Sequence, residues 1–88
     1  MRLEFRRSFL KDIRKIKDAS IRERLKQTIQ SMEAAKDLHV MTDLKQIKGT
    51  SDYYRLRIGD YRLGLKMVDD SLEVIRILPR GDIYKKFP

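Results

Sequence analysis

The strongest constraint on the fold of this chain is the alternation of apolar and charged residues between positions 53 and 67. Side chains of a β-strand point to opposite faces in turn, so a period of two predicts strands with one buried face. Gly59-Asp60 divides the stretch, and such a pair between two alternating runs is typical of a two-residue hairpin. The apolar residues expected on the buried face are Tyr54, Leu56, Ile58, Tyr61, Leu63, Leu65 and Met67.

The first third of the chain follows a helical period instead. A short alternating stretch at residues 2–5 predicts a first strand. Two helices are then predicted, over residues 8–17 with Ser8 as the N-cap and over residues 20–36 with Ser20 as the N-cap. Their apolar stripes are Phe9, Ile13 and Ile16 in the first helix, and Ile21, Leu25, Ile29 and Met32 in the second.

The remaining stretches complete the predicted order of elements. Residues 37–49 are the least regular part of the chain, and residues 69–71 predict a turn. Residues 72–78 are largely apolar on both faces, as in a buried central strand, and residues 79–88 predict a loop or a short terminal helix. The order strand, helix, helix and three-stranded antiparallel meander predicts an α+β fold. Both helices would pack on one face of the sheet and leave the other face partly open.

Length and composition predict a single small domain over residues 1–88. A chain this short buries only about 60–65% of its unfolded surface, so a stabilising partner is expected. The absence of cysteine excludes disulfides and thiolate metal sites, and no apolar run is long enough for a membrane span. The basic N-terminus is followed by no apolar stretch, which argues against a signal peptide. We therefore expect a cytoplasmic protein.

The net charge of +8 points to a polyanionic partner such as RNA, DNA or an acidic protein. The alternation places Arg55, Arg57, Arg62 and Lys66 on the face of the hairpin that points away from the helices. A tight turn brings Arg57 and Arg62 side by side, which is unfavourable unless an anion lies between them. The alternative is a basic face that only keeps the domain soluble.

Arginine and tyrosine on one face suit the chemistry of RNA. The planar guanidinium forms paired, charge-assisted hydrogen bonds with phosphate and can stabilise the extra charge on phosphorus during strand cleavage. Tyr53 and Tyr84 are suited to stack on unpaired bases, although tyrosines in small domains are also common core residues.

Three motifs in order resemble the RelE/ParE superfamily of bacterial toxins. Residues 54–64, YRLRIGDYRLG, resemble the family's "YRxRxGdYRv" hairpin. Residues 44–49, LKQIKG, resemble the "LkxLkG" segment before it, and residues 77–84, ILPRGDIY, resemble the closing "hRxdiY" motif. With the strand–helix–helix opening, the resemblance covers nearly the whole chain.

The resemblance implies the toxin of a type II toxin–antitoxin pair. RelE-like members cut mRNA on the ribosome through attack of the 2′-hydroxyl, without a metal or another cofactor. Position by position, Arg62 matches the arginine that stabilises the transition state, and Arg80 and Tyr84 match the closing basic residue and the tyrosine that stacks on or activates the RNA. Arg55 and Arg57 match basic residues at the cleavage site. Further expected phosphate-binding residues are Lys45, Lys48, Lys66 and Lys85.

Two departures from the family pattern leave the general base unassigned. Lysines in the best-studied branch are replaced by Arg55 and Arg57, and arginine does not give up its proton. Pro79 stands where many relatives have a histidine, and the single histidine, His39, is expected to be a loop residue without a role in the site. The candidates for the base are Tyr84 first, and then Lys45, Lys48 and Lys85.

Two alternatives to the ribosome-dependent nuclease remain open at this point. One is a ParE-like inhibitor of DNA gyrase without chemistry of its own, and the other is an inactive basic RNA-binding relative. Both toxin functions predict a cognate antitoxin encoded in the same operon, which folds on binding and contributes apolar area and acidic charge. The nuclease also requires the ribosome and mRNA as partners.

Overall fold

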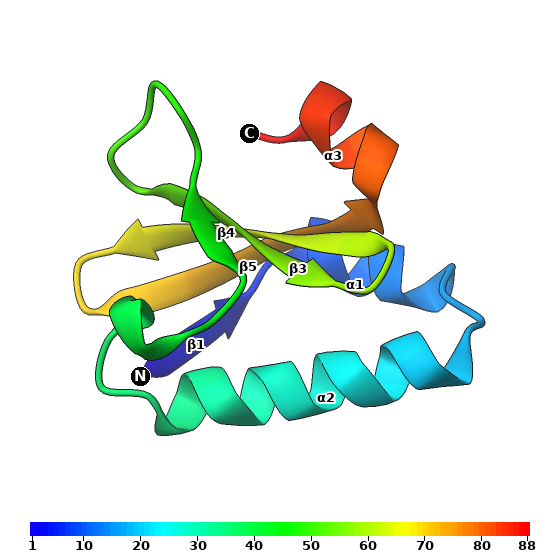
Figure 1. Ribbon diagram of the computed structural model, residues 1–88, viewed down its shortest axis with the longest axis horizontal. Helices are drawn as coiled ribbons and strands as arrows, with labels where there is room; N and C mark the ends of the chain where they lie inside the picture. The colour runs from blue at the N-terminus through cyan, green and yellow to red at the C-terminus, as the bar shows by residue number, and fades with distance from the viewer.

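The computed structural model describes residues 1–88 and shows one sheet with α2 along one face and α3 over the other (Figure 1). The elements are β1 Arg2–Phe5, α1 Arg7–Arg14, α2 Ala19–Ala34, a 3₁₀ turn Leu38–Val40, β2 Leu44–Gln46, β3 Tyr53–Ile58, β4 Tyr61–Val68, β5 Ser71–Pro79 and α3 Arg80–Lys86. No helix has both the length and the apolar character that crossing a bilayer requires.

The predicted α+β class is confirmed, but the sheet is larger than the predicted meander. Its five strands lie in the order β1-β5-β4-β3-β2, and β1 pairs with β5 in parallel while all other pairs are antiparallel. The sheet is therefore mixed. The additional strand β2 lies in the stretch that we expected to be irregular, and its three residues are too few to show an alternation.

The alternation of the hairpin is confirmed by burial. Leu56, Ile58, Leu63 and Leu65 are all at most 3% exposed and belong to the main core. This core lies between the inner face of the sheet and the helices, where Phe9 of α1 and three residues of α2 complete it. The α2 residues in the core are Ile21, Leu25 and Met32.

The outer face of the sheet is more covered than we predicted. Residues 80–86 form α3, and a second buried cluster, consisting of Leu78, Ile83 and Phe87, lies between α3 and the sheet. The partly buried Tyr53 packs against this cluster, with its ring edge-on to Phe87 at 5.6 Å between centroids. The C-terminal helix thus covers one part of the outer face and leaves the basic part open.

Neither predicted serine cap is present. Helix α1 begins at Arg7 without a side-chain cap, and the Ser8 hydroxyl donates to the Ile75 carbonyl at 2.6 Å. The N-cap of α2 is Asp18, whose carboxylate accepts hydrogen bonds from the backbone N–H groups of Ser20 and Ile21. Hydrogen bonds from Ser20 and Ile21 also lower the pKa of Asp18. Ser20 therefore lies inside the first turn, and α2 ends at Ala34, before Lys36.

Helix α1 closes the edge of β5 beyond the point where β1 ends. The last pair between these strands joins Phe5 to Val74, and the backbone groups of β5 then lack a strand partner on that side. The Ser8 hydroxyl satisfies one of them, the Ile75 carbonyl, and the Asp12 carboxylate accepts from the Ile77 N–H at 3.0 Å. Side chains of α1 thus take the place of a neighbouring strand, which is one way in which proteins protect a sheet edge.

The buried Asp12 also forms an ion pair with the partly buried Arg76. Its carboxylate is 4% exposed and accepts from Arg76 Nε at 2.7 Å and Nη2 at 3.0 Å. The hydrogen bond with Asp12 raises the pKa of Arg76. With the Ile77 N–H, the carboxylate has three donors, so its burial leaves no lone charge.

We expect Asp12→Ala to lower the free energy of unfolding by about 3–5 kcal/mol, because it leaves the Arg76 charge and the Ile77 N–H without a partner. Urea denaturation followed by circular dichroism measures this change. Replacing both partners, in the double variant Asp12→Leu with Arg76→Met, should lower the free energy of unfolding by less than Asp12→Ala alone does. A single variant within about 1 kcal/mol of the unchanged protein would contradict the role given to this pair.

The cap of α2 predicts a specific pH dependence. Since the pKa of Asp18 is lowered in the folded state, its charge stabilises the fold above its unfolded pKa of about 4. This contribution is lost as the pH falls through the lower folded-state pKa. The urea midpoints of the unchanged protein and Asp18→Ala should therefore differ at pH 7 and converge in acid. A difference that is the same at all pH values would contradict the charge-dependent cap.

Candidate functional site

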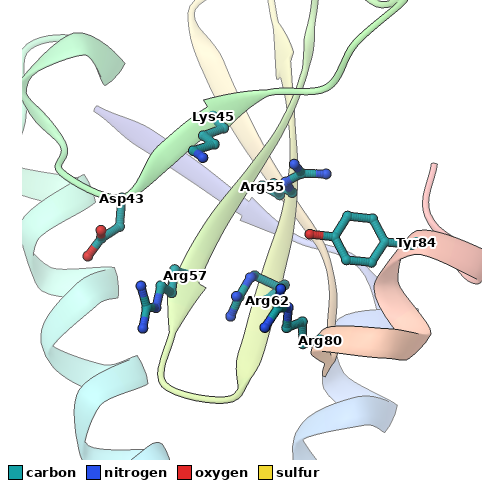
Figure 2. A pocket seen from close by; sticks show the side chains of 7 residues that line it. All are labelled: Asp43, Lys45, Arg55, Arg57, Arg62, Arg80 and Tyr84. Atoms are coloured by element: carbon teal, nitrogen blue, oxygen red, sulfur yellow. The ribbon is translucent and has the colours of Figure 1, made fainter.

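A basic pocket of about 340 Å³ lies on the outer face of the sheet, beside α3. The strands β2, β3 and β4 form its floor, and α3 forms one wall (Figure 2). Its seven lining residues are Asp43, Lys45, Arg55, Arg57, Arg62, Arg80 and Tyr84. Five of these side chains are cationic, so the pocket has a strongly positive potential that would attract an anion.

The hairpin places two arginines opposite each other at the bottom of this basic pocket. Gly59 has a φ of 57°, which permits the two-residue turn, and Arg57 pairs with Arg62 in the register of β3 and β4. The turn also packs closely on α2, since a Cβ on Gly59 would lie 2.9 Å from Ile21 Cδ1. The predicted juxtaposition of Arg57 and Arg62 is thus confirmed, and the core fixes its position.

Backbone carbonyls hold the guanidinium of Arg62 in place. Its Nη1 donates to the Gly59 carbonyl at 3.0 Å and to the Tyr61 carbonyl at 2.9 Å. These bonds engage one nitrogen and leave the other donors of the guanidinium for a ligand. The neighbouring Arg80 is tied to the same turn, because its backbone N–H donates to the Asp60 carbonyl at 2.8 Å. Figure 2 shows both arginine side chains in the pocket beside the hairpin.

Tyr84 projects from α3 over the opposite side of the pocket. Tyr84 is 54% exposed, and the guanidinium carbon of Arg55 lies 4.8 Å from the centroid of its ring. This cation–π contact positions both side chains and leaves the ring accessible to a ligand (Figure 2). The phenol and the arginines therefore surround a single space.

Asp43 also lines the basic pocket, although the sequence did not predict it there. It has a left-handed φ of 61°, and its carbonyl accepts from the Arg57 N–H at 3.1 Å, just before β2 begins. Asp is among the few residues that adopt this conformation readily, which is the only signal the sequence offers. Asp43 is the single acidic side chain that lines the basic pocket, and its carboxylate lies on the same side as Arg57 (Figure 2).

Several residues expected at the site lie elsewhere. Lys48 and Lys85 do not line the basic pocket, and both are exposed. Lys66 is on the outer face as predicted, but it contacts Tyr53, with its Nζ 5.2 Å from the ring centroid. Tyr53 packs against Phe87 and so lies outside the pocket as well. His39, as expected, lies outside it too, exposed in the 3₁₀ turn.

The chain passes from β5 into α3 directly beside the pocket. Pro79 takes the N-cap position of α3, so the residue that stands in place of a histidine serves as a junction between strand and helix. Helix α3 is then anchored at its far end by Phe87, whose ring lies over Gly64 of β4. A Cβ on Gly64 would lie 2.9 Å from three atoms of that ring, so only glycine allows this close approach.

Comparisons with known proteins show the family to which the chain belongs. The family described as "ParE toxin of type II toxin-antitoxin system, parDE" matches residues 3–84. The chain is 36% identical to Toxin RelE3 of Methanocaldococcus jannaschii over 89 residues, which covers all of both proteins. The chain therefore belongs to the RelE/ParE family of toxins of type II toxin–antitoxin systems.

Solved structures show the same fold. The RelB–RelE antitoxin–toxin complex from Methanococcus jannaschii matches with a TM-score of 0.82 and 36% identity, over 96% of this chain and 98% of that one. The archaeal RelE–RelB complex from Pyrococcus horikoshii matches with a TM-score of 0.73 and 23% identity, over 91% and 94%. The likeness to the second structure concerns the fold alone.

The packing of Phe87 on Gly64 predicts a stability effect that depends on apolar packing and removes no charged group. Gly64→Ala should displace Phe87 and lower the free energy of unfolding by about 1–3 kcal/mol, the usual cost of overpacking. Gly81→Ala is the matched control, because a Cβ there meets nothing within 4 Å and alanine favours the helix. Thermal denaturation should show a lower midpoint for Gly64→Ala only. Equal midpoints for both variants would contradict the anchoring of α3 through Phe87.

Proposed function

We propose that this chain is an endoribonuclease that cleaves mRNA on the ribosome and so inhibits translation. The observation that carries the proposal is the convergence of five cationic side chains and an accessible tyrosine in one pocket. Cleavage of RNA by its own 2′-hydroxyl needs no metal, provided that cations compensate the charge that develops on phosphorus. The 2′-oxygen attacks the adjacent phosphorus, the bond to the 5′-oxygen breaks, and the products are a 2′,3′-cyclic phosphate and a 5′-hydroxyl.

The geometry suggests a different role for each group of pocket residues. Arg62 and Arg80 are held beside the same turn and would stabilise the pentacoordinate phosphorus. Arg55, Arg57 and Lys45 would bind the flanking phosphates, since they line the strand side of the basic pocket. The ring of Tyr84 would stack on a base, because it is exposed toward the pocket.

The position of the side chains narrows the candidates for the proton acceptor. Lys48 and Lys85 lie outside the basic pocket, whereas Tyr84 and Lys45 line it. The Arg55 guanidinium carbon lies 4.8 Å from the centroid of the Tyr84 ring, so this contact holds the phenol at the pocket. We therefore assign the proton transfer to Tyr84, with Lys45 as the second candidate. The ribosome would supply the remaining alignment of the mRNA, which makes a weak base sufficient.

We further propose a cognate antitoxin, encoded in the same operon, as the partner of this chain. The solved M. jannaschii relative is a complex of a toxin with its antitoxin. A net charge of +8 suits an acidic partner, and exposed apolar side chains such as Leu10 and Val40 would contribute apolar area. A toxin that acts on ribosomes would work in the cytoplasm.

Inhibition of DNA gyrase, without any chemistry, is the second candidate. Two observations favour it: the matching family is described as the ParE toxin, and no histidine lines the basic pocket. In that case the pocket would bind a partner surface or DNA phosphate. Stalled supercoiling by purified gyrase, together with intact mRNA after induction, would support this function in place of RNA cleavage.

We expect Arg62→Ala to slow mRNA cleavage by about 100-fold or more, the usual cost of removing one donor from a developing anion. Primer extension on mRNA after induction of the toxin measures the cut sites, and growth arrest should be lost with them. Binding to the antitoxin should survive, because Arg62 is held by its own hairpin and the core is unchanged.

Arg14→Ala is a suitable control, because it removes an exposed arginine of α1 far from the basic pocket. Cleavage by this variant should equal that of the unchanged protein. If Arg62→Ala still cuts mRNA at the same sites and rate, the assignment of the site is wrong. If the unchanged protein arrests growth without cutting any transcript, the nuclease function itself is wrong.

A further inference from the structure

A second basic cleft, of about 350 Å³, lies on the other side of the C-terminal segment. Its basic side chains are Arg6, Lys66, Arg76 and Lys86, and Tyr53 and Phe87 form its aromatic wall. No acidic side chain lines it. The residues come from segments far apart in the chain, which meet here because α3 folds back over β4 and β5.

Two of the four cations are already compensated. Arg6 donates to Glu73, and Arg76 is bound to the buried Asp12. Lys66 and Lys86 form no ion pair and donate no hydrogen bond within the protein. Their two charges are therefore not taken up by an ion pair within the protein and are available to an external anion.

Lys66 is also positioned more firmly than an ordinary surface lysine. It is partly buried, and its Nζ lies 5.2 Å from the centroid of the Tyr53 ring. Tyr53 is held in turn by its edge-on contact with the buried Phe87. The aromatic pair thus supports the ammonium group over the cleft, which lowers the entropy that binding a ligand would cost.

The two clefts lie along one strand. Arg62 and Lys66 are four residues apart on β4, so their Cα atoms are about 13 Å apart, and both side chains point to the same face. Gly64 lies midway, and Phe87 covers it. The C-terminal segment therefore separates the basic pocket from the second basic cleft. An extended polyanion that crosses this segment would reach both.

We propose that the second basic cleft binds a phosphate of the same RNA strand that is cleaved in the basic pocket, a few nucleotides from the scissile bond. Lys66 and Lys86 donate to this phosphate, and their binding sets the register of the strand without taking part in the chemistry. The inference rests on the proposed nuclease function. It predicts that affinity depends on RNA length, since a dinucleotide in the basic pocket is too short to reach the second basic cleft.

The test uses the double variant Lys66→Ala with Lys86→Ala. Fluorescence anisotropy with a labelled single-stranded RNA, 2′-O-methylated so that it cannot be cut, measures the affinity. We expect binding to be weaker by about tenfold or more, because the variant removes both charge-assisted hydrogen bonds to the phosphate. The slope of log K against log salt should become shallower by about 0.7 for each phosphate that the variant no longer binds. Affinity for a dinucleotide should stay the same.

The matched control is Lys17→Ala with Lys36→Ala, which removes the same charge from exposed positions beside the two ends of α2. Circular dichroism should show that both double variants are folded. Equal RNA affinities for the two double variants would overturn the proposal, because only general charge would then matter. Unchanged RNA binding with weaker binding of the acidic antitoxin would also overturn it, in favour of a protein partner at this cleft.

The failure of this inference can be told apart from the failure of the proposed function. If the unchanged protein binds and cuts RNA and the Arg62→Ala variant does not cut it, the nuclease function holds whatever the lysine variants do. If the unchanged protein cuts mRNA after induction but binds no single-stranded RNA, the second phosphate site is wrong while the nuclease function holds.

Discussion

The interaction on which the rest of the structure depends is the contact of the Asp12 carboxylate with β5. This one group satisfies the Ile77 N–H and neutralises Arg76, so α1 replaces a strand along the part of β5 that β1 does not reach. The strand continues directly into Pro79 and α3, which carries Arg80 and Tyr84. The position of one wall of the basic pocket is therefore set by a buried carboxylate on the first helix, on the far side of β5.

The shape of the outer face of the sheet depends on apolar packing, whereas the edge of β5 depends on a charged group. Phe87 lies on Gly64 because that residue has no side chain, and this apolar packing separates two groups of cations. Arg62 and Lys66 would otherwise belong to one continuous basic surface. An aromatic ring between them divides the surface into two clefts of similar volume, about 340 and 350 Å³. The fold thus produces two separate basic clefts along a single alternating strand.

The parts of the fold that follow a strong period could be predicted from the sequence. The hairpin, its buried face and the pairing of Arg57 with Arg62 all follow from the alternation around Gly59-Asp60. The parts that were missed depend on interactions between distant residues. Strand β2 is three residues long, the cap of α2 is Asp18 where Ser20 was expected, and Ser8 binds β5 at Ile75. No local pattern shows that Phe87 covers Gly64, and hence that Lys66 lies apart from the basic pocket.

The opposed pair of Arg57 and Arg62 has a consequence for how the toxin exists in a cell. A folded state that holds like charges together is stabilised by whatever anion occupies the space between them, so folding and anion binding are thermodynamically linked. A ligand present at about 100 times its dissociation constant adds about 2.7 kcal/mol to the free energy of unfolding. For a small core this is a large share of the total stability. The fraction of antitoxin-free toxin that stays folded would then depend on the concentration of polyanions around it. Persistence of the toxin would therefore depend on its surroundings as much as on its sequence.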